Sequence, residues 1–102
     1  MSILRLAEDV LRRPTMYTLR GSFPEFAAFM QGYVSGAARA EHAEVLLAEW
    51  RDFERWLSDR IGSASPGEVL EALLAAHGEG ASAILQEHLG EYAVRRSPQT
   101  TR

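Results

Sequence analysis

The side chains that most often carry out chemistry in proteins are sparse in this sequence, and they form no catalytic pattern. The 102 residues include no cysteine, and all eleven basic residues are arginine. Thiolate nucleophiles, thiolate metal sites, Schiff bases and phosphate-loop lysines are therefore excluded. The three histidines, His42, His77 and His88, show neither four-residue spacing nor a His-Glu-x-x-His pattern, so we predict no metal site.

Other catalytic signatures are also missing. No Gly-x-Ser-x-Gly turn, which presents the nucleophile in many hydrolases, is present. The short Gly78-Glu79-Gly80 string follows a predicted helix rather than a strand, so it does not read as a phosphate cradle. Acids three residues apart, such as Glu68 and Glu71, are typical of an exposed helix surface. We therefore predict that the protein is not an enzyme and has neither catalytic residues nor a cofactor.

Composition places the chain among single globular domains. Hydrophobic residues make up 46% and charged residues 25%, which is ordinary for such a domain. No apolar run approaches the roughly 20 residues that span a bilayer, and early charged residues leave no signal-peptide core. We predict a cytoplasmic protein with one helical domain over residues 1–96 and a disordered tail over 97–102.

Apolar residues recur at helical spacing along the chain and predict an all-α fold, a compact bundle of about five helices without a sheet. The expected helices cover roughly residues 2–12, 22–40, 44–61, 66–77 and 80–94. Pro14 should end the first helix, and a loop should follow over residues 14–21. Ser22 with Glu25, and Ser65 with Glu68, have the spacing of capping boxes.

Between the first two helices lies the most distinctive motif, Arg13-Pro14-x-Met16-Tyr17. A loop between two amphipathic helices needs apolar anchors, and Met16 and Tyr17 are its largest apolar side chains apart from Leu19. We predict that Met16 and Tyr17 pack inward and have a structural role, so that Tyr17→Ala destabilises the fold. Unchanged stability with loss of partner binding would instead identify the motif as a recognition site.

The second predicted helix also carries small residues at four-residue intervals, namely Ala28, Gly32, Gly36 and Ala40. Each interior glycine costs a helix about 1 kcal/mol relative to alanine. The stripe therefore predicts that another helix approaches closely, either in the same chain or in a second copy. The alternative is that both glycines are exposed and merely tolerated.

The third predicted helix combines acids with aromatic residues. Trp50 and Phe53 fall on its core stripe, whereas Trp56 is offset and could be a surface anchor. The acids favour a basic protein partner, with a solvated helix face as the alternative, and a net charge of -3 argues against nucleic acid. The candidate contact face comprises Glu44, Glu49, Asp52, Glu54, Trp56 and Asp59.

Arg-Pro-x-Met-Tyr, followed by Phe-x-x-Phe-x-x-Gly-Tyr and a tryptophan-bearing helix, resembles a family of small uncharacterised bacterial proteins. Its members commonly read Arg-Pro-Gly-Met-Tyr-Leu-Gly, whereas this chain has Thr15 in place of the glycine and a longer loop at 18–21. The family resembles small cytosolic proteins of bacterial toxin loci, many of them immunity proteins. The matching positions are Arg13, Pro14, Met16, Tyr17, Phe26, Phe29, Gly32, Tyr33 and Trp56.

This resemblance implies a non-enzymatic protein-binding module, specifically an immunity protein or antitoxin that masks a toxin. The alternative is a structural or regulatory adaptor that acts as a homodimer through the small-residue stripe. The expected partner is thus a protein, possibly a toxin, or a second copy of the chain, and neither nucleic acid nor a membrane. A toxin encoded nearby that kills cells lacking this protein would distinguish the two.

Overall fold

The computed structural model describes residues 2–39, 43–62 and 65–96, and in these ranges the chain is all-α and has no strand, as predicted. Ala40 and the predicted tail at 97–102 lie outside the described residues. None of the described helices combines the length and apolar character that a bilayer-spanning segment needs. The five long helices are α1 (Ile3–Arg12), α3 (Phe23–Ala37), α4 (Ala43–Ile61), α5 (Val69–His77) and α6 (Ala81–Arg96).

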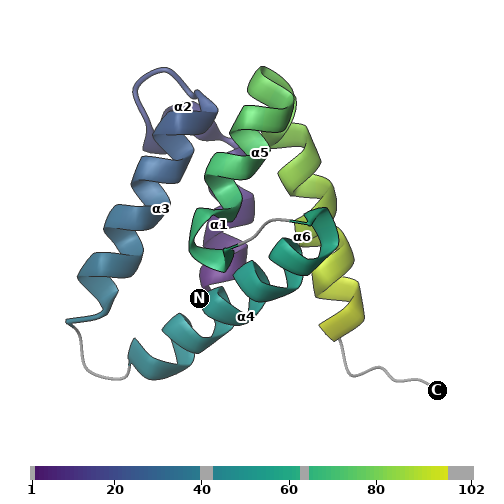
Figure 1. Cartoon of the computed structure of the whole chain (residues 1–102). Coiled ribbons are helices and arrows are strands. Elements are labelled where there is room, and N and C mark those ends of the chain that lie inside the picture. Colours follow the sequence, from purple (N-terminus) through teal and green to yellow (C-terminus); the bar gives the residue numbers. More distant parts are fainter. Residues whose placement is uncertain (1, 40–42, 63–64, 97–102) are drawn as a thin grey trace.

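The helices surround one apolar core. Helices α3, α5 and α6 stand side by side, α4 crosses beneath them, and α1 lies behind α5 (Figure 1). Since α1 packs against α3, α4 and α6, it occupies the middle of the bundle. The largest side chains that are almost fully buried come from all five long helices: Ile3, Val10, Phe26, Met30, Phe53, Leu57, Val69, Leu73 and Leu85.

Pro14 ends one helix and begins another. Helix α1 starts at the cap residue Ser2, whose hydroxyl accepts a hydrogen bond from the Arg5 N–H, and it ends at Arg12. Pro14 then occupies the first position of a four-residue helix, α2 (Pro14–Tyr17). The prediction of a loop over 14–21 was therefore wrong for residues 14–17, because the fixed φ of proline also suits the first turn of a helix.

The two predicted capping boxes have different outcomes. The first is confirmed: the Glu25 N–H donates to Ser22 Oγ at 3.3 Å, and the Ser22 N–H donates to Glu25 Oε1 at 3.0 Å. The second is wrong, because Ser65 makes no side-chain capping bond. The chain instead forms a 3₁₀ turn, η1 (Pro66–Glu68), so Glu68 does not occupy the third position of an α-helix.

The remaining short element is a second 3₁₀ turn, η2 (Gly78–Gly80), which joins α5 to α6. Gly62 and Gly78 have φ values of 74° and 55° at the ends of α4 and α5. Glycine adopts this left-handed region without steric cost, so both predicted helix ends are confirmed.

Candidate functional site

The connection between α1 and α3 displays two large apolar side chains to solvent. Met16 is 70% exposed and Leu19 is 86% exposed. The expectation that Met16 packs inward is therefore wrong. Successive residues of a helix point about 100° apart, so the inward direction of Tyr17 leaves its neighbour Met16 facing away from the bundle.

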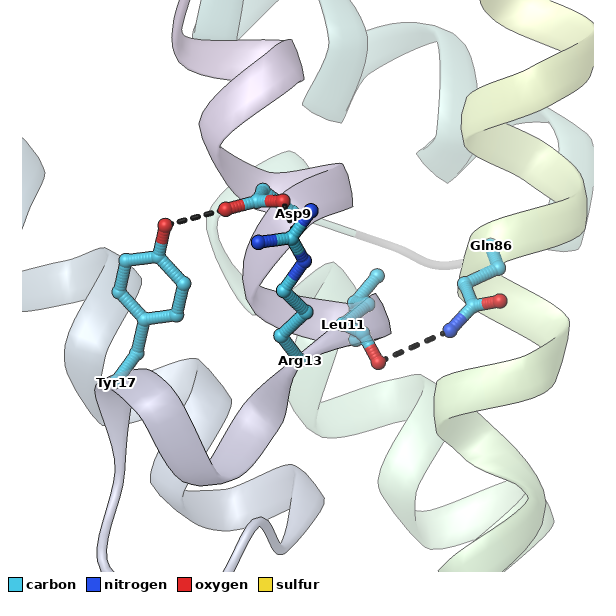
Figure 2. Close-up of polar contacts among 5 residues, drawn as sticks. All are labelled: Asp9, Leu11, Arg13, Tyr17 and Gln86. Atoms are coloured by element: carbon cyan, nitrogen blue, oxygen red, sulfur yellow. Dashed lines mark hydrogen bonds and ion pairs between the residues drawn. The ribbon is translucent and has the colours of Figure 1, made fainter.

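Tyr17 makes the contacts that hold α2 in place. Its hydroxyl donates to Asp9 Oδ2 on α1 (Figure 2), and its ring meets Phe29 edge-on at 5.5 Å between centroids. The hydrogen bond to Asp9 is the main cause that raises the pKa of Tyr17 above its usual value. Asp9 Oδ1 also lies 3.7 Å from Arg13 Nε. The Asp9 carboxylate therefore contacts both Arg13, between α1 and α2, and Tyr17, at the end of α2.

Hydrogen bonds also fix the segment after α2. Both the N–H and the hydroxyl of Thr18 donate to the Pro14 carbonyl at 2.8 Å, and the Gly21 N–H donates to Thr18 Oγ1 at 3.0 Å. The Arg20 N–H donates to the Glu25 carboxylate at 3.1 Å. Because backbone N–H groups, that of Ser22 first, donate to this carboxylate, the pKa of Glu25 lies below its usual value. Met16 and Leu19 are therefore displayed on an ordered scaffold.

The same scaffold is attached to the C-terminal part of the fold. Gln86 on α6 donates from Nε2 to the Leu11 carbonyl at 3.1 Å (Figure 2). This carbonyl belongs to the last turn of α1, where carbonyl groups lack partners within the helix. The junction is thus held by α6 on one side and by Tyr17 on the other.

Arginines flank the exposed apolar residues. Arg12, Arg13 and Arg20 are exposed, and the sequence has no acid between residues 12 and 24. Next to Arg20, a hollow of about 560 Å³ opens between the start of α3 and the turn after α5. We use the term corner surface for Arg12, Arg13, Met16, Leu19 and Arg20.

Sequence reasoning did not find this surface as a unit. It named Arg13 and Met16 as structural residues and did not propose Arg12, Leu19 or Arg20 as site residues. The available signal was the run of residues 12–24, which has three arginines, two large aliphatic side chains and no acid.

The predicted acidic face of α4 is not a single face. Glu44, Asp52 and Asp59 are exposed, whereas Glu49 and Glu54 are partly buried. Five residues correspond to about 500° of helix rotation, which places Glu49 and Glu54 about 140° apart on opposite flanks.

The two flanking acids consequently have different surroundings. Glu49 Oε1 accepts a hydrogen bond from the Ile3 N–H at 3.1 Å and so caps the start of α1. Glu54 faces a groove that borders α3 and α5. Both acids are therefore less exposed than Glu44, Asp52 and Asp59.

Trp56 is packed against its neighbours and is partly exposed. Its ring lies 5.1 Å from Tyr92, 6.0 Å from Phe53 and 6.1 Å from His88, as centroid distances, and the Arg60 guanidinium sits 5.0 Å from its ring centre. Residues of α6 cover part of the flank of α4 on which Trp56 lies, and its role as a surface anchor stays a prediction. Trp50 and Phe53 are buried, as predicted.

Among the described residues, no helix covers Gly32 or Gly36 in the small-residue stripe of α3. A Cβ atom built on Gly32 or Gly36 would meet no described atom within 4 Å. The prediction of a close helix crossing within the chain is therefore wrong. Tyr33, on the same helix, is 41% exposed and stacks on Phe29.

The described histidines occupy different environments. His77 is exposed at the end of α5, and His42 lies outside the described residues. His88 is partly buried: its Nδ1 has no hydrogen-bond partner among the described residues and lies 3.9 Å from Glu91 Oε1. Burial lowers the pKa of His88. Among the described residues, no three histidine, aspartate or glutamate side chains are grouped to hold a metal ion.

Searches of protein-family models, curated proteins and solved structures find no match for this chain.

Proposed function

We propose that this protein is a non-enzymatic protein-binding module that contacts an acidic partner through the corner surface. The observation that supports the proposal is the exposure of Met16 and Leu19 on a hydrogen-bonded connection flanked by arginines. Methionine and arginine are enriched at protein interfaces, and arginine is also frequent among the residues that dominate binding energy.

Apolar and basic side chains of the corner surface would contribute to binding in different ways. Burying Met16 or Leu19 against a partner would contribute about 1.5–3 kcal/mol each. Because Tyr17 and Thr18 already fix the backbone, little conformational entropy is lost on binding. Arg12 and Arg20 would attract an acidic surface and speed the first encounter.

The specific role we propose is that of a cytoplasmic immunity protein or antitoxin that masks a toxin. Its support is the resemblance of the Arg-Pro-x-Met-Tyr string to proteins of bacterial toxin loci. Met16 belongs both to that string and to the corner surface, so the proposed contact includes a motif residue. Glu44, Asp52 and Asp59 are the part of the predicted acidic face that a basic partner could still reach.

Affinity capture followed by mass spectrometry would supply the partner, and binding kinetics with purified variants would test the surface. The double variant Met16→Ala/Leu19→Ala should raise the dissociation rate, while its stability stays within about 0.5 kcal/mol of the natural chain. Arg12→Glu with Arg20→Glu should slow association and flatten its dependence on salt. Val45→Ala is the matched control, because Val45 is 82% exposed on α4, away from this surface.

Four results would contradict the proposal or a part of it. If the corner variants bind as well as the natural chain does, the surface is wrong. If charge reversal at Asp52 and Asp59 weakens binding instead, the acidic side of α4 is the contact. Catalytic turnover by the purified protein would refute the proposal of a non-enzymatic binding module. A partner that is harmless to cells lacking this protein would refute the antitoxin role.

A homodimeric adaptor is the second candidate, and a different observation favours it. Residues 26–38 carry no charged side chain, and Gly32 and Gly36 are open to solvent in the single chain. Two copies of an acidic chain could approach there without like-charge repulsion. Sedimentation equilibrium should then show a dimer that Gly36→Leu dissociates, and a monomer at every concentration would exclude this candidate.

A further inference from the structure

A groove lined by α3, α4 and α5 has the features of a ligand site that the proposed function does not use. Its volume is about 360 Å³, within the range of roughly 300–1,000 Å³ that is usual for small-molecule sites. Apolar walls come from Met30 and Val34 of α3, Trp50 of α4 and Leu70 of α5. None of the residues that line the groove belongs to the corner surface.

Glu54 is the acidic group among these apolar walls. It is partly buried, and this burial raises its pKa above the usual value, while Arg51 and a hydrogen bond from the Trp50 indole lower it less. Within the described ranges, no arginine or histidine nitrogen forms an ion pair with its carboxylate. A carboxylate that has lost part of its hydration without gaining an ion pair attracts a cation.

The lining also limits the chemical class of the ligand. An anion would be repelled by Glu54 and Glu71, which outnumber Arg51, the single basic side chain among the lining residues. A neutral apolar molecule would remove the remaining water from Glu54 and offer no charge in return. A cation on an apolar stem satisfies both parts of the groove, because its stem can contact Ala27, Val34 and Leu70 while its charged end pairs with Glu54.

We propose that this groove binds an organic cation, a guanidinium or primary ammonium group on a short alkyl stem, which pairs with Glu54. The same chemistry is found in a free alkylamine and in an arginine or lysine side chain of a protein. This site is separate from the corner surface, so its test does not depend on the partner proposed above.

The test is a titration with n-butylguanidinium chloride, followed by NMR of the indole N–H signals of the two tryptophans. A Trp56→Phe variant identifies the Trp50 signal, which reports on the groove because Trp50 lines it together with Glu54. We expect this signal to shift and saturate with a dissociation constant of about 1 mM. Glu54→Gln should weaken binding about tenfold or more, because a charge-assisted hydrogen bond is lost.

Matched controls separate the charge from the shape of the groove. Glu71→Gln removes a rim charge and should change the affinity far less than Glu54→Gln does. Arg51→Gln removes the groove's own cation and should leave binding equal or tighter. The neutral isostere n-butylurea should not bind, and lowering the pH through the pKa of Glu54 should weaken binding of the guanidinium.

Either of two results would overturn the proposal: no saturable shift of the Trp50 signal, or equal binding of n-butylurea and n-butylguanidinium. Equal affinity of Glu54→Gln, with an otherwise unchanged NMR spectrum, would also exclude it. If the peptide acetyl-Ala-Arg-Ala-amide binds more tightly than n-butylguanidinium, the ligand is a side chain of a protein. If n-butylguanidinium binds more tightly than the peptide, the ligand is a free small-molecule cation. Both outcomes support the site.

Discussion

Replacing Gly32 by alanine should make this protein more stable. Gly32 lies in the interior of α3, and a Cβ atom there would meet no described atom within 4 Å. Alanine is about 1 kcal/mol more favourable than glycine inside a helix, because it loses less backbone entropy on folding. With no steric cost to subtract, nearly all of this difference should appear as added stability.

The size of the effect follows from the position in the helix. Gly36 precedes the last residue of α3, where the helix frays, so Gly36→Ala should gain roughly 0.5 kcal/mol or less. For a domain of this size, 1 kcal/mol corresponds to about 4–8 °C in Tm. Gly32→Ala should therefore unfold several degrees higher than the natural chain.

Urea unfolding followed by far-UV circular dichroism would measure the change as a higher midpoint with an unchanged slope. Gly21→Ala is the matched control, since it adds the same methyl group where φ is +74° and Pro14 Cβ would be 3.2 Å away. That variant should lose about 1–2 kcal/mol. A Gly32→Ala chain that unfolds at lower urea would refute the reasoning and would imply that another chain covers α3.

Three further predictions concern packing and charge. Trp56→Ala should lower the free energy of unfolding, measured in urea, by about 2–4 kcal/mol, because its ring packs against Tyr92. An unchanged midpoint of urea unfolding would mean that this packing does not stabilise the fold. Burial lowers the pKa of His88 in the folded state. Below about pH 6.5 the unfolded chain therefore binds a proton that the folded chain does not, and the free energy of unfolding decreases as the pH falls. This loss should be smaller in His88→Gln, and identical pH profiles would contradict it. Gln86→Met should cost about 1 kcal/mol by leaving the Leu11 carbonyl unpaired, and hydrogen exchange that is unchanged in the last turn of α1 would argue against this role.

The helices could be predicted from sequence because their signals are local. Helix α1 has a serine cap and a following proline, and its observed ends agree with the prediction. Gly62 ends α4 for an equally local reason, its positive φ. Where one residue has two local effects, prediction failed: Pro14 stops α1, and it also starts α2.

The surfaces could not be predicted because they depend on how helices cross. Hydrophobicity indicates that Met16 and Tyr17 avoid water, but only the tilt of α2 determines which of them turns inward. Trp56 is partly covered because α6 passes beside α4, and no feature of α4 alone encodes that neighbour. Gly32 and Gly36 have the same spacing whether a helix covers them or water does.

The central place of α1 has a consequence for the order in which the chain assembles. The Leu11 carbonyl receives its hydrogen bond from a residue 75 positions later, and the Ile3 N–H donates to one 46 positions later. During synthesis, α1 is made before the helices that bury its apolar side. Helices α3 and α4 can cover part of its apolar side earlier, but the part that packs against α6 stays exposed until α6 has left the ribosome. Chains that stall before α6 is complete should consequently aggregate or be degraded rather than fold in part.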